Sequence, residues 1–202
     1  MILFIGPPGC GKGTQSNLFQ EIYKISNFSF GSFLRELTKK NDELGLKVSE
    51  LIDKGNFVSS DLIFNNIDKS IFEKNLILDG YPRTLEQAVF FNDFLVKKKL
   101  KIDLIVEFSA KEEDFLLRVL NRKICEDCRK DFCDCGSNRF VIREDDNKTI
   151  FYQRLANYNK NRILIKNFYI KNKVNYVSFN ASQTKEESFK NLEKILKENK
   201  LI

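Results

Sequence analysis

The sequence predicts an α/β protein with a doubly wound, parallel, five-stranded sheet. Five short apolar runs alternate with helical stretches, a glycine-rich segment follows the first run, and an Asp-Gly-Tyr-Pro-Arg turn follows the third. Strands that alternate with helices are typical of a parallel sheet joined by crossover connections. A chain of 202 residues suits one domain of this kind, and its 42% of hydrophobic residues can fill the core.

The five strands are predicted where apolar and β-branched residues gather in short runs, each followed by a helical stretch. These strands cover residues 2–5, 27–30, 75–79, 103–108 and 174–179. Two stretches break the alternation. Residues 29–58 have a helical pattern with no strand after it, and residues 123–147 combine four cysteines with charges and show no clear period. We expect both to be small mobile insertions at the carboxyl edge of the sheet, where ligands bind in such folds.

The remaining residues, 1–28, 59–122 and 148–202, are expected to form one core nucleotide-binding domain. Within it, the segment GPPGCGKGT over residues 6–14 follows the first strand and opens a helix. Glycines let successive amide groups point at one anion, the helix N-terminus adds its positive dipole end, and Lys12 reaches the outer phosphates. A nucleoside triphosphate is therefore the expected ligand. Gly13 stands where a hydroxyl normally holds magnesium, so a magnesium ion should depend on phosphate oxygens, water and carboxylates elsewhere.

A second motif, LDGYPRT over residues 78–84, ends the third strand. Asp79 should emerge beside the phosphate loop, where a carboxylate can order magnesium-bound water. Arg83 offers a planar fork to a phosphate, and Pro82 fixes the turn before it. Gln87 lies one helical turn after Arg83, where its amide can offer a donor and an acceptor to a base edge.

Composition narrows the class of reaction. The chain has no histidine, which excludes histidine-based triads, histidine general bases and metal sites that need imidazole. Phosphoryl transfer depends on positioning and positive charge rather than on a covalent protein intermediate, so a kinase is favoured over a hydrolase. The net charge of +6 is spread along the chain, which favours nucleotides over a nucleic-acid partner. Without a signal peptide or a long apolar stretch, we expect a cytoplasmic protein that does not bind membranes.

These motifs, with the sequence REDD at residues 143–146 and Arg154 eleven residues after Arg143, resemble the adenylate kinases. The resemblance runs from residue 1 to about residue 183 and implies a sheet of the P-loop kinase type. It implies the reaction ATP + AMP ⇌ 2 ADP, with magnesium on the triphosphate. Two insertions around one cleft favour a monomer.

The resemblance also implies roles for individual residues. It implies that one lysine and five arginines act on the transferring phosphates: Lys12, Arg83, Arg118, Arg122, Arg143 and Arg154. It implies an ATP site formed by the phosphate loop, two arginines and one glutamine: Gly9, Cys10, Gly11, Lys12, Gly13, Thr14, Arg118, Arg122 and Gln183. It implies an AMP site formed by residues of both insertions and of the turn after the third strand: Phe30, Arg35, Asn56, Phe57, Val58, Gly80, Arg83, Gln87, Arg143 and Arg154. Asp79 would hold magnesium through water.

Arginine usage supports this assignment independently. Nine of the 34 basic residues are arginines, so lysine is the usual surface cation of the chain. Six of the nine fall at the phosphate-binding positions: Arg35, Arg83, Arg118, Arg122, Arg143 and Arg154. A guanidinium binds phosphate with two parallel hydrogen bonds and an ammonium does not, so arginine is expected where geometry matters.

Two residues depart from the adenylate kinase pattern. Phe30 stands where a threonine usually contacts the adenine of AMP, and Ser32 stands where an aspartate is usual. A phenyl ring cannot donate a hydrogen bond, so the preference for AMP is less certain than the kinase assignment. Gln87 favours adenine. The alternatives are a UMP/CMP kinase of the same superfamily and a nucleotide-binding regulatory protein without turnover.

Four cysteines within eleven residues predict a zinc-clamped lid over residues 123–147, held through Cys125, Cys128, Cys133 and Cys135. Cys125 and Cys128 have the spacing of a zinc knuckle, and the resemblance to adenylate kinases with a metal-binding lid supports the assignment. Cys133 and Cys135 are one residue apart, so a tight turn must bring both inward, or Asp131 or Asp134 must replace one sulfur. A metal-free lid with free thiols is the alternative. Cys10 stands apart in the phosphate loop.

Overall fold

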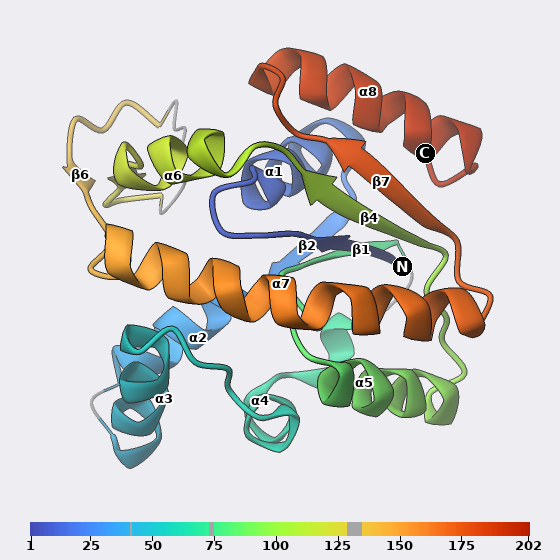
Figure 1. Ribbon diagram of the computed structural model, residues 1–202, viewed down its shortest axis with the longest axis horizontal. Coiled ribbons are helices and arrows are strands. Elements are labelled where there is room, and N and C mark those ends of the chain that lie inside the picture. Colours follow the sequence, from blue (N-terminus) through green and yellow to red (C-terminus); the bar gives the residue numbers. More distant parts are fainter. Residues whose placement is uncertain (41, 73–74, 129–134) are drawn as a thin grey trace.

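The computed structural model of the chain describes residues 1–40, 42–72, 75–128 and 135–202. Its centre is a parallel sheet of five strands in the order β2-β3-β1-β4-β7 (Figure 1). The strands are β1 (Ile2–Ile5), β2 (Ser26–Ser29), β3 (Leu76–Asp79), β4 (Leu104–Ser109) and β7 (Tyr176–Asn180). The predicted doubly wound parallel sheet is confirmed, with each strand within two residues of its predicted bounds.

Strand register brings three strand ends together at the carboxyl edge of the sheet. Phe4 of β1 pairs with Asp79 at the end of β3, and Ile5 pairs with Glu107 of β4. Because β1 lies between β3 and β4, the connections after these strands leave in opposite directions and open a crevice between them. The loop after β1 and the turn after β3 therefore lie next to each other.

Helices cover both faces of the sheet (Figure 1). On one face, α1 (Lys12–Tyr23), α6 (Glu112–Leu120) and α8 (Lys185–Glu198) pack with Ile2 and Phe4 in one hydrophobic cluster. On the other face, α5 (Leu85–Lys97) and the long α7 (Lys148–Lys171) pack with Leu3 and Ile5 in a second cluster. Alternation of side chains along β1 thus fills two separate cores.

Side chains at the helix starts set where the site-bearing helices begin. Thr84 accepts from the amide of Gln87 and fixes the start of α5 directly after Arg83. Asn147 accepts from the amide of Ile150 and starts α7 directly after the acidic residues of the lid. Each cap satisfies an amide that the helix itself leaves unpaired.

In its described residues, the first insertion is helical, as predicted, and has no strand residue after Ser29, the last residue of β2. Its elements are α2 (Phe30–Thr38) and α3 (Glu43–Asp53), and α4 (Ser60–Asn66) and the short 3-10 helix η1 (Lys69–Ile71) follow it. The second predicted strand ends one residue early, because Phe30 is the first residue of α2. Ser29 accepts from the amide of Ser32 and caps that helix, which ends the strand.

The second insertion contains a short antiparallel pair that periodicity did not reveal. β5 (Ile124–Cys125) pairs with β6 (Phe140–Val141), and two residues a strand are too few to show a repeating pattern. Figure 1 places this pair and α2 with α3 on the side of the molecule toward which the sheet strands point. Among the described residues, no helix is long and apolar enough to span a membrane.

Candidate active site

The phosphate loop, residues 6–14, joins β1 to α1. Gly11 precedes the first residue of α1 and no side chain caps that helix, so the amides of the first turn are not taken up by a cap. Gly9 has a φ of 77°, and a β-carbon there would lie 2.4 Å from the backbone oxygen of Phe115. Only glycine fits this close approach, which fixes the loop against α6 and leaves the open helix end facing the cleft.

Lys12 is folded back onto the loop that carries it. Its Nζ donates to the backbone oxygens of Gly6 at 2.9 Å and Pro7 at 3.0 Å, and lies 3.1 Å from Cys10 Sγ. Carbonyl dipoles are weaker partners for an ammonium than a phosphate is, because hydrogen bonds between two ionised groups are the stronger class. Lys12 is therefore free to exchange these contacts for an anion in the loop.

Asp79 lies directly across the crevice from the phosphate loop, as its place after β3 predicted. Its carboxylate is buried, accepts from Ser29 Oγ at 3.2 Å, and has an oxygen 3.4 Å from where a β-carbon on Gly13 would be. A β-carbon at position 13 would be in ordinary van der Waals contact with this carboxylate. Gly13, which lacks the usual hydroxyl, and the Asp79 carboxylate, which was expected to order magnesium-bound water instead, are thus neighbours in the cleft.

Arg35 and Arg83 converge beside Gly31, although they come from α2 and from the turn after β3. A β-carbon on Gly31 would lie 3.3 Å from Arg35 Nη1 and 3.6 Å from Arg83 Nη2. Arg83 Nε donates to the backbone oxygen of Gly80 at 2.8 Å, which aims the guanidinium into the cleft. The pKa of Arg83 is lowered to about 10, chiefly by burial and then by the nearby Arg154, with Asp79 and Asp145 partly opposing the shift.

The pKa of Arg35 is lowered in the same way, chiefly by burial, with Asp145 opposing the effect and Arg122, Arg83 and Arg154 adding to it. Guanidinium groups this close repel one another in a setting that hydrates them poorly. An anion bound between Arg35 and Arg83 would relieve both costs.

Two buried aspartates hold two further arginines in the cleft. Arg154 Nη1 lies 2.6 Å from Asp145, and Arg122 Nε lies 3.3 Å from Asp146. Burial raises the pKa of Asp145, but Arg154, Arg35 and Arg143 together hold it below its usual value. For Asp146, burial outweighs Arg122 and Arg143, so its pKa is raised. The two aspartates of the REDD motif thus orient arginines rather than bind an anion themselves.

Arg118 lies at the opposite side of the cleft, next to the loop after β7. Its Nη2 donates to the backbone oxygen of Gln183 at 3.3 Å. Gln15 of α1 also reaches this loop, donating to the backbone oxygen of Lys185 at 3.0 Å. A planar guanidinium beside a loop forms a slot of the kind that can accept a flat aromatic base.

A single cavity of about 930 Å³ connects these groups. It contains the whole phosphate loop except Pro7, together with most of the predicted site residues. The predicted residues that line it are Gly9, Cys10, Gly11, Lys12, Gly13, Thr14, Arg35, Phe57, Asp79, Gly80, Arg83, Arg118, Arg122, Arg143, Arg154 and Gln183. In the described part of the chain, ten lysines and arginines line the cavity against one carboxylate, Asp79. The cavity is therefore a site for a polyanion.

Four predicted base contacts do not line this cavity: Asn56 is exposed to solvent, and the other three are buried. Phe30, Asn56, Val58 and Gln87 are not among the described residues that line the cavity. Phe30 is 1% exposed and stacks on Tyr81 with ring centroids 4.5 Å apart. Gln87 is 5% exposed, and both ends of its amide are engaged: it donates to the backbone oxygen of Val58 at 2.8 Å and accepts from the amide of Arg83 at 2.7 Å.

The sequence reasoning missed several cleft residues, among them Tyr158 and Arg162. Tyr158 and Arg162 line the cavity and follow Arg154 on α7 at intervals of four residues, so all three share one helix face. The arginine usage could have identified Arg162, because a chain that prefers lysine placed an arginine eight residues after Arg154. Tyr158 carried no sequence signal beyond this spacing.

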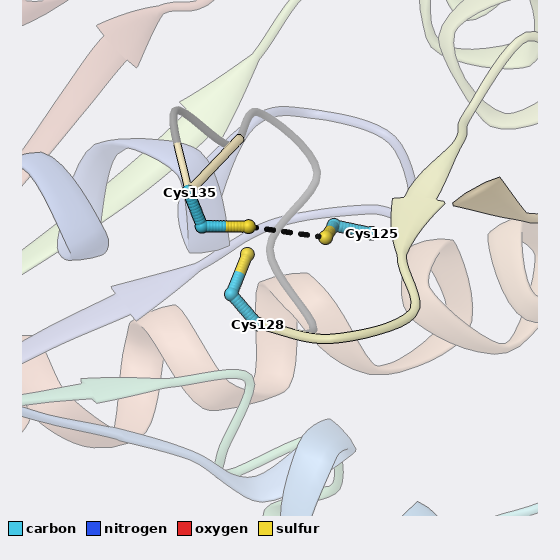
Figure 2. Close-up of side chains that lie close together, drawn as sticks. All are labelled: Cys125, Cys128 and Cys135. Carbon is cyan, nitrogen blue, oxygen red and sulfur yellow. Dashed lines mark hydrogen bonds between the residues drawn. The ribbon is translucent and has the colours of Figure 1, made fainter. Parts of the chain in front are cut away.

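The cysteines of the lid converge as predicted, as far as they are described. Sγ atoms of Cys125, Cys128 and Cys135 lie within 4.8 Å of one another (Figure 2), and those of Cys125 and Cys135 are 3.6 Å apart. Thiolates at about 2.3 Å from a tetrahedral zinc ion are about 3.8 Å apart, so the spacing fits a metal better than a disulfide. Cys133, Asp131 and Asp134 lie outside the described residues.

Chemically, the site can hold a chain of phosphates between a phosphate loop and a ring of arginines. Positive charge comes from both sides of the crevice, which is the arrangement that stabilises charge on a phosphoryl group in transit. In the described residues, Asp79 is the one acid on the cavity wall, and it lies where it can order a metal-bound water.

Comparisons with known proteins agree with this geometry. A family model described as adenylate kinase matches residues 4–174. An adenylate kinase of Petrotoga mobilis is 33% identical, with 97% of each chain covered. An adenylate kinase of Rickettsia akari is 32% identical over 98% of this chain and 100% of its own. One of Thermotoga petrophila is 36% identical over 78% of this chain and 79% of its own.

The excess of positive charge predicts that inorganic tripolyphosphate alone stabilises the protein. At a hundredfold excess over Kd, a ligand that binds only the folded state adds about 2.7 kcal/mol, or about 5 °C or more in Tm for a chain of this size. We expect this gain in a thermal unfolding scan, and we expect 0.5 M salt to reduce it sharply by screening. Arg118→Ala should reduce the gain. Arg139→Ala, which removes an exposed lid arginine paired with Asp127, should not. A gain that is the same in both variants would contradict the assignment.

Proposed function

We propose a specific reaction for this chain, which belongs to the adenylate kinase family and is a nucleoside monophosphate kinase: ATP + AMP ⇌ 2 ADP. The observation that carries the proposal is the convergence of Lys12, Arg83 and Arg154 on one cavity from three separate elements. A phosphate loop alone would suit any nucleotide-binding protein. Arginines on the far side of the crevice supply a second phosphate site, which a kinase with two nucleotide substrates needs.

In this proposal the two nucleotides meet end to end across the crevice. ATP binds along the phosphate loop, with Arg118 and Gln183 beside its base and Arg122 beside its phosphates. The phosphate of AMP lies between Arg35 and Arg83. Transfer then runs in line between the two phosphates, while Lys12, Arg143 and Arg154 neutralise the charge that spreads over the equatorial oxygens. No covalent protein intermediate is needed.

Magnesium would be held by phosphate oxygens and by water ordered on Asp79. The fit rests on this carboxylate, which is buried beside Gly13 and accepts from Ser29. When bound, magnesium would neutralise phosphate charge at this site. Gly13 in place of a hydroxyl-bearing residue leaves space at the loop, so the ion depends on the substrate for most of its ligands.

We further propose that the two insertions, residues 29–58 and 123–147, close over the cleft as units separate from the core of residues 1–28, 59–122 and 148–202. Contacts from α7 support a closing role. Arg154 Nη2 donates to the backbone oxygen of Ile52 at 3.4 Å, and Asn157 Nδ2 donates to that of Gly55 at 3.0 Å. The first insertion can thus be held directly against the helix that carries Arg154. Closure would exclude water, which otherwise competes as the acceptor.

Acceptor choice depends on the corner formed by Phe30, Val58 and Gln87. Adenine would have to replace the Gln87 contacts to Val58 and Arg83 with contacts to its ring nitrogen and amine. Phe30 supplies an apolar ring to this corner and no donor. We propose AMP as the preferred acceptor because a glutamine amide matches adenine, with Asn56 and Phe57 completing the wall. A UMP/CMP kinase is the alternative.

For the lid, we propose a structural zinc ion held by Cys125, Cys128 and Cys135 with a fourth ligand from Cys133, Asp131 or Asp134. The support is the cluster of three Sγ atoms and the tight turn at Gly136, whose φ is 81°. A closed tetrahedral site has no open position for water, so its role would be to hold a loop too short to have a hydrophobic core. We also propose that the protein acts as a cytoplasmic monomer without nucleic-acid or membrane partners.

The reaction is tested by an assay of ADP formation from ATP with AMP, UMP, CMP and GMP as parallel acceptors. We expect AMP to give the highest kcat/KM, by at least about tenfold, because the wrong base cannot match both the donor and the acceptor of the Gln87 amide. A higher value for UMP or CMP would replace the adenylate assignment with the pyrimidine one. Absence of transfer to all four acceptors in folded protein would support a regulatory protein without turnover.

Lys12→Met tests the role of the loop lysine. Removing a positive charge that stabilises the transferring group should lower kcat by at least about a hundredfold, as for the loss of a comparable electrostatic donor. The fold should be retained, because the side-chain hydrogen bonds of Lys12 to the described residues all lie within its own loop. Lys194→Met on α8, whose side chain is 77% exposed, is the control and should leave kcat unchanged. Near-normal turnover of folded Lys12→Met protein would rule out the proposed role.

The zinc proposal is tested by elemental analysis of protein purified without added metal. We expect about one zinc ion per chain, and a loss of this zinc in Cys125→Ser. The lid of that variant should also become sensitive to limited proteolysis, because metal binding stabilises the folded lid. Ser137→Ala, in the same lid, should keep its zinc and its resistance. Zinc-free wild-type protein with a protease-resistant lid would favour the metal-free alternative.

A further inference from the structure

Glu107 is a buried carboxylate that the proposed reaction does not use. It lies in β4 between Val106 and Phe108, at a sheet position where its neighbours are fully buried and apolar, and is itself 6% exposed. A negative charge close to a polyphosphate site opposes substrate binding, and burying a carboxylate is costly unless it is hydrogen-bonded. A specific partner for Glu107 is therefore expected.

That partner is Tyr158 of α7. Tyr158 Oη donates to Glu107 Oε1 at 2.7 Å, a length typical of a charge-assisted hydrogen bond. Burial raises the pKa of Tyr158 strongly, and the hydrogen bond and charge of Glu107 raise it further, so the hydroxyl remains a donor. Cys10 of the phosphate loop adds a smaller effect in the same direction, which places Tyr158 within electrostatic reach of that loop.

Among the described residues, this is the one side-chain hydrogen bond between α7 and the five-stranded sheet. In the same part of the chain, α7 also contacts the core by apolar packing through Leu155, Ile165 and Tyr169 and by a cation-π contact, in which Lys166 Nζ lies 5.4 Å from the ring centroid of Tyr176 in β7. Apolar packing is not directional and permits a helix to shift or rotate slightly, whereas a hydrogen bond at 2.7 Å fixes both distance and angle. The bond therefore sets the position of α7 over β4.

The position of α7 matters because Arg154 lies one turn before Tyr158 on the same helix face. Arg154 lines the cavity with Tyr158, and Lys12 faces it from the phosphate loop. We propose that Glu107 and Tyr158 are positioning residues for phosphoryl transfer: their hydrogen bond fixes α7 on β4 so that Arg154 meets the phosphates opposite Lys12. This inference rests on the kinase reaction proposed above, because it assigns a role in the same site.

Tyr158→Phe removes the hydroxyl and keeps the ring, so it tests the bond with little loss of packing. A small misplacement of a catalytic group can reduce the rate about a hundredfold. We expect kcat to fall at least about tenfold, with KM for ATP and for the acceptor changed by less than about threefold. Tyr152→Phe is the matched control, because Tyr152 is on the same helix and 41% exposed. A kcat within about twofold of wild type in folded Tyr158→Phe protein would overturn the proposal.

Glu107→Gln separates positioning from charge. The amide oxygen can still accept from Tyr158, so we expect kcat within about threefold of wild type. If Glu107→Gln loses as much activity as Tyr158→Phe, the charge itself is required and the positioning role is wrong. Both changes are close to isosteric, so thermal unfolding should confirm that the variants are folded before kinetics are compared.

A double-mutant cycle shows whether Tyr158 acts through Arg154. In an Arg154→Ala background the group being positioned is gone, so adding Tyr158→Phe should reduce kcat by less than about twofold. A further tenfold loss would indicate a general structural role and contradict the proposal. Kinetics are measured with the best acceptor of the wild-type protein. A wild type that transfers to no acceptor overturns both proposals, whereas an active wild type with unaffected variants overturns only this one.

Discussion

Repulsion among the cations of the cleft is the constraint on which the rest of the structure depends. Arg35 and Arg83 approach the same point beside Gly31, and burial lowers the pKa of both. Such a cluster is unfavourable in the empty protein and becomes favourable when phosphates occupy it. The surrounding fold must therefore hold cations close together against their own repulsion. Binding of a phosphate-bearing substrate then reduces this repulsion, so the folded state itself favours polyanions.

Three devices hold the cations in place. Backbone oxygens accept hydrogen bonds from the ammonium of Lys12 and the guanidinium of Arg83. These bonds partly offset the positive charge without adding a carboxylate to the cavity wall. Asp145 pairs with Arg154 and Asp146 pairs with Arg122, and neither aspartate lines the cavity. Two rigid cores, one on each face of the sheet, fix the elements that carry these groups. Arg83, Arg122 and Arg154 are thus each aimed by a partner that the phosphates do not have to displace, whereas Lys12 must exchange its partners for phosphate.

The sequence predicted the parts of this design that rest on local patterns. The five strands were apparent from runs of apolar residues, and the phosphate loop and the Asp79 to Arg83 turn from spacing. Contacts between segments far apart in the chain could not be predicted from the sequence. The bond from Tyr158 to Glu107 joins residues 51 apart, and nothing in either neighbourhood indicates the other. Gln87 was predicted from its place after Arg83, but its engagement by Val58 depends on how the first insertion packs. The pair β5 and β6 is too short to give a period.

The central claim is that phosphates replace the protein's own contacts at Lys12 and lie between the two sets of arginines. The most direct measurement is a crystal structure with a single ligand in which two adenosines are joined by five phosphates. We expect Lys12 Nζ to leave Gly6 and Pro7 and to lie about 3 Å from a phosphate oxygen, with Arg35 and Arg83 on one phosphate of the chain. A complex in which Lys12 keeps both carbonyl contacts, with the phosphate chain outside the loop, would contradict the account.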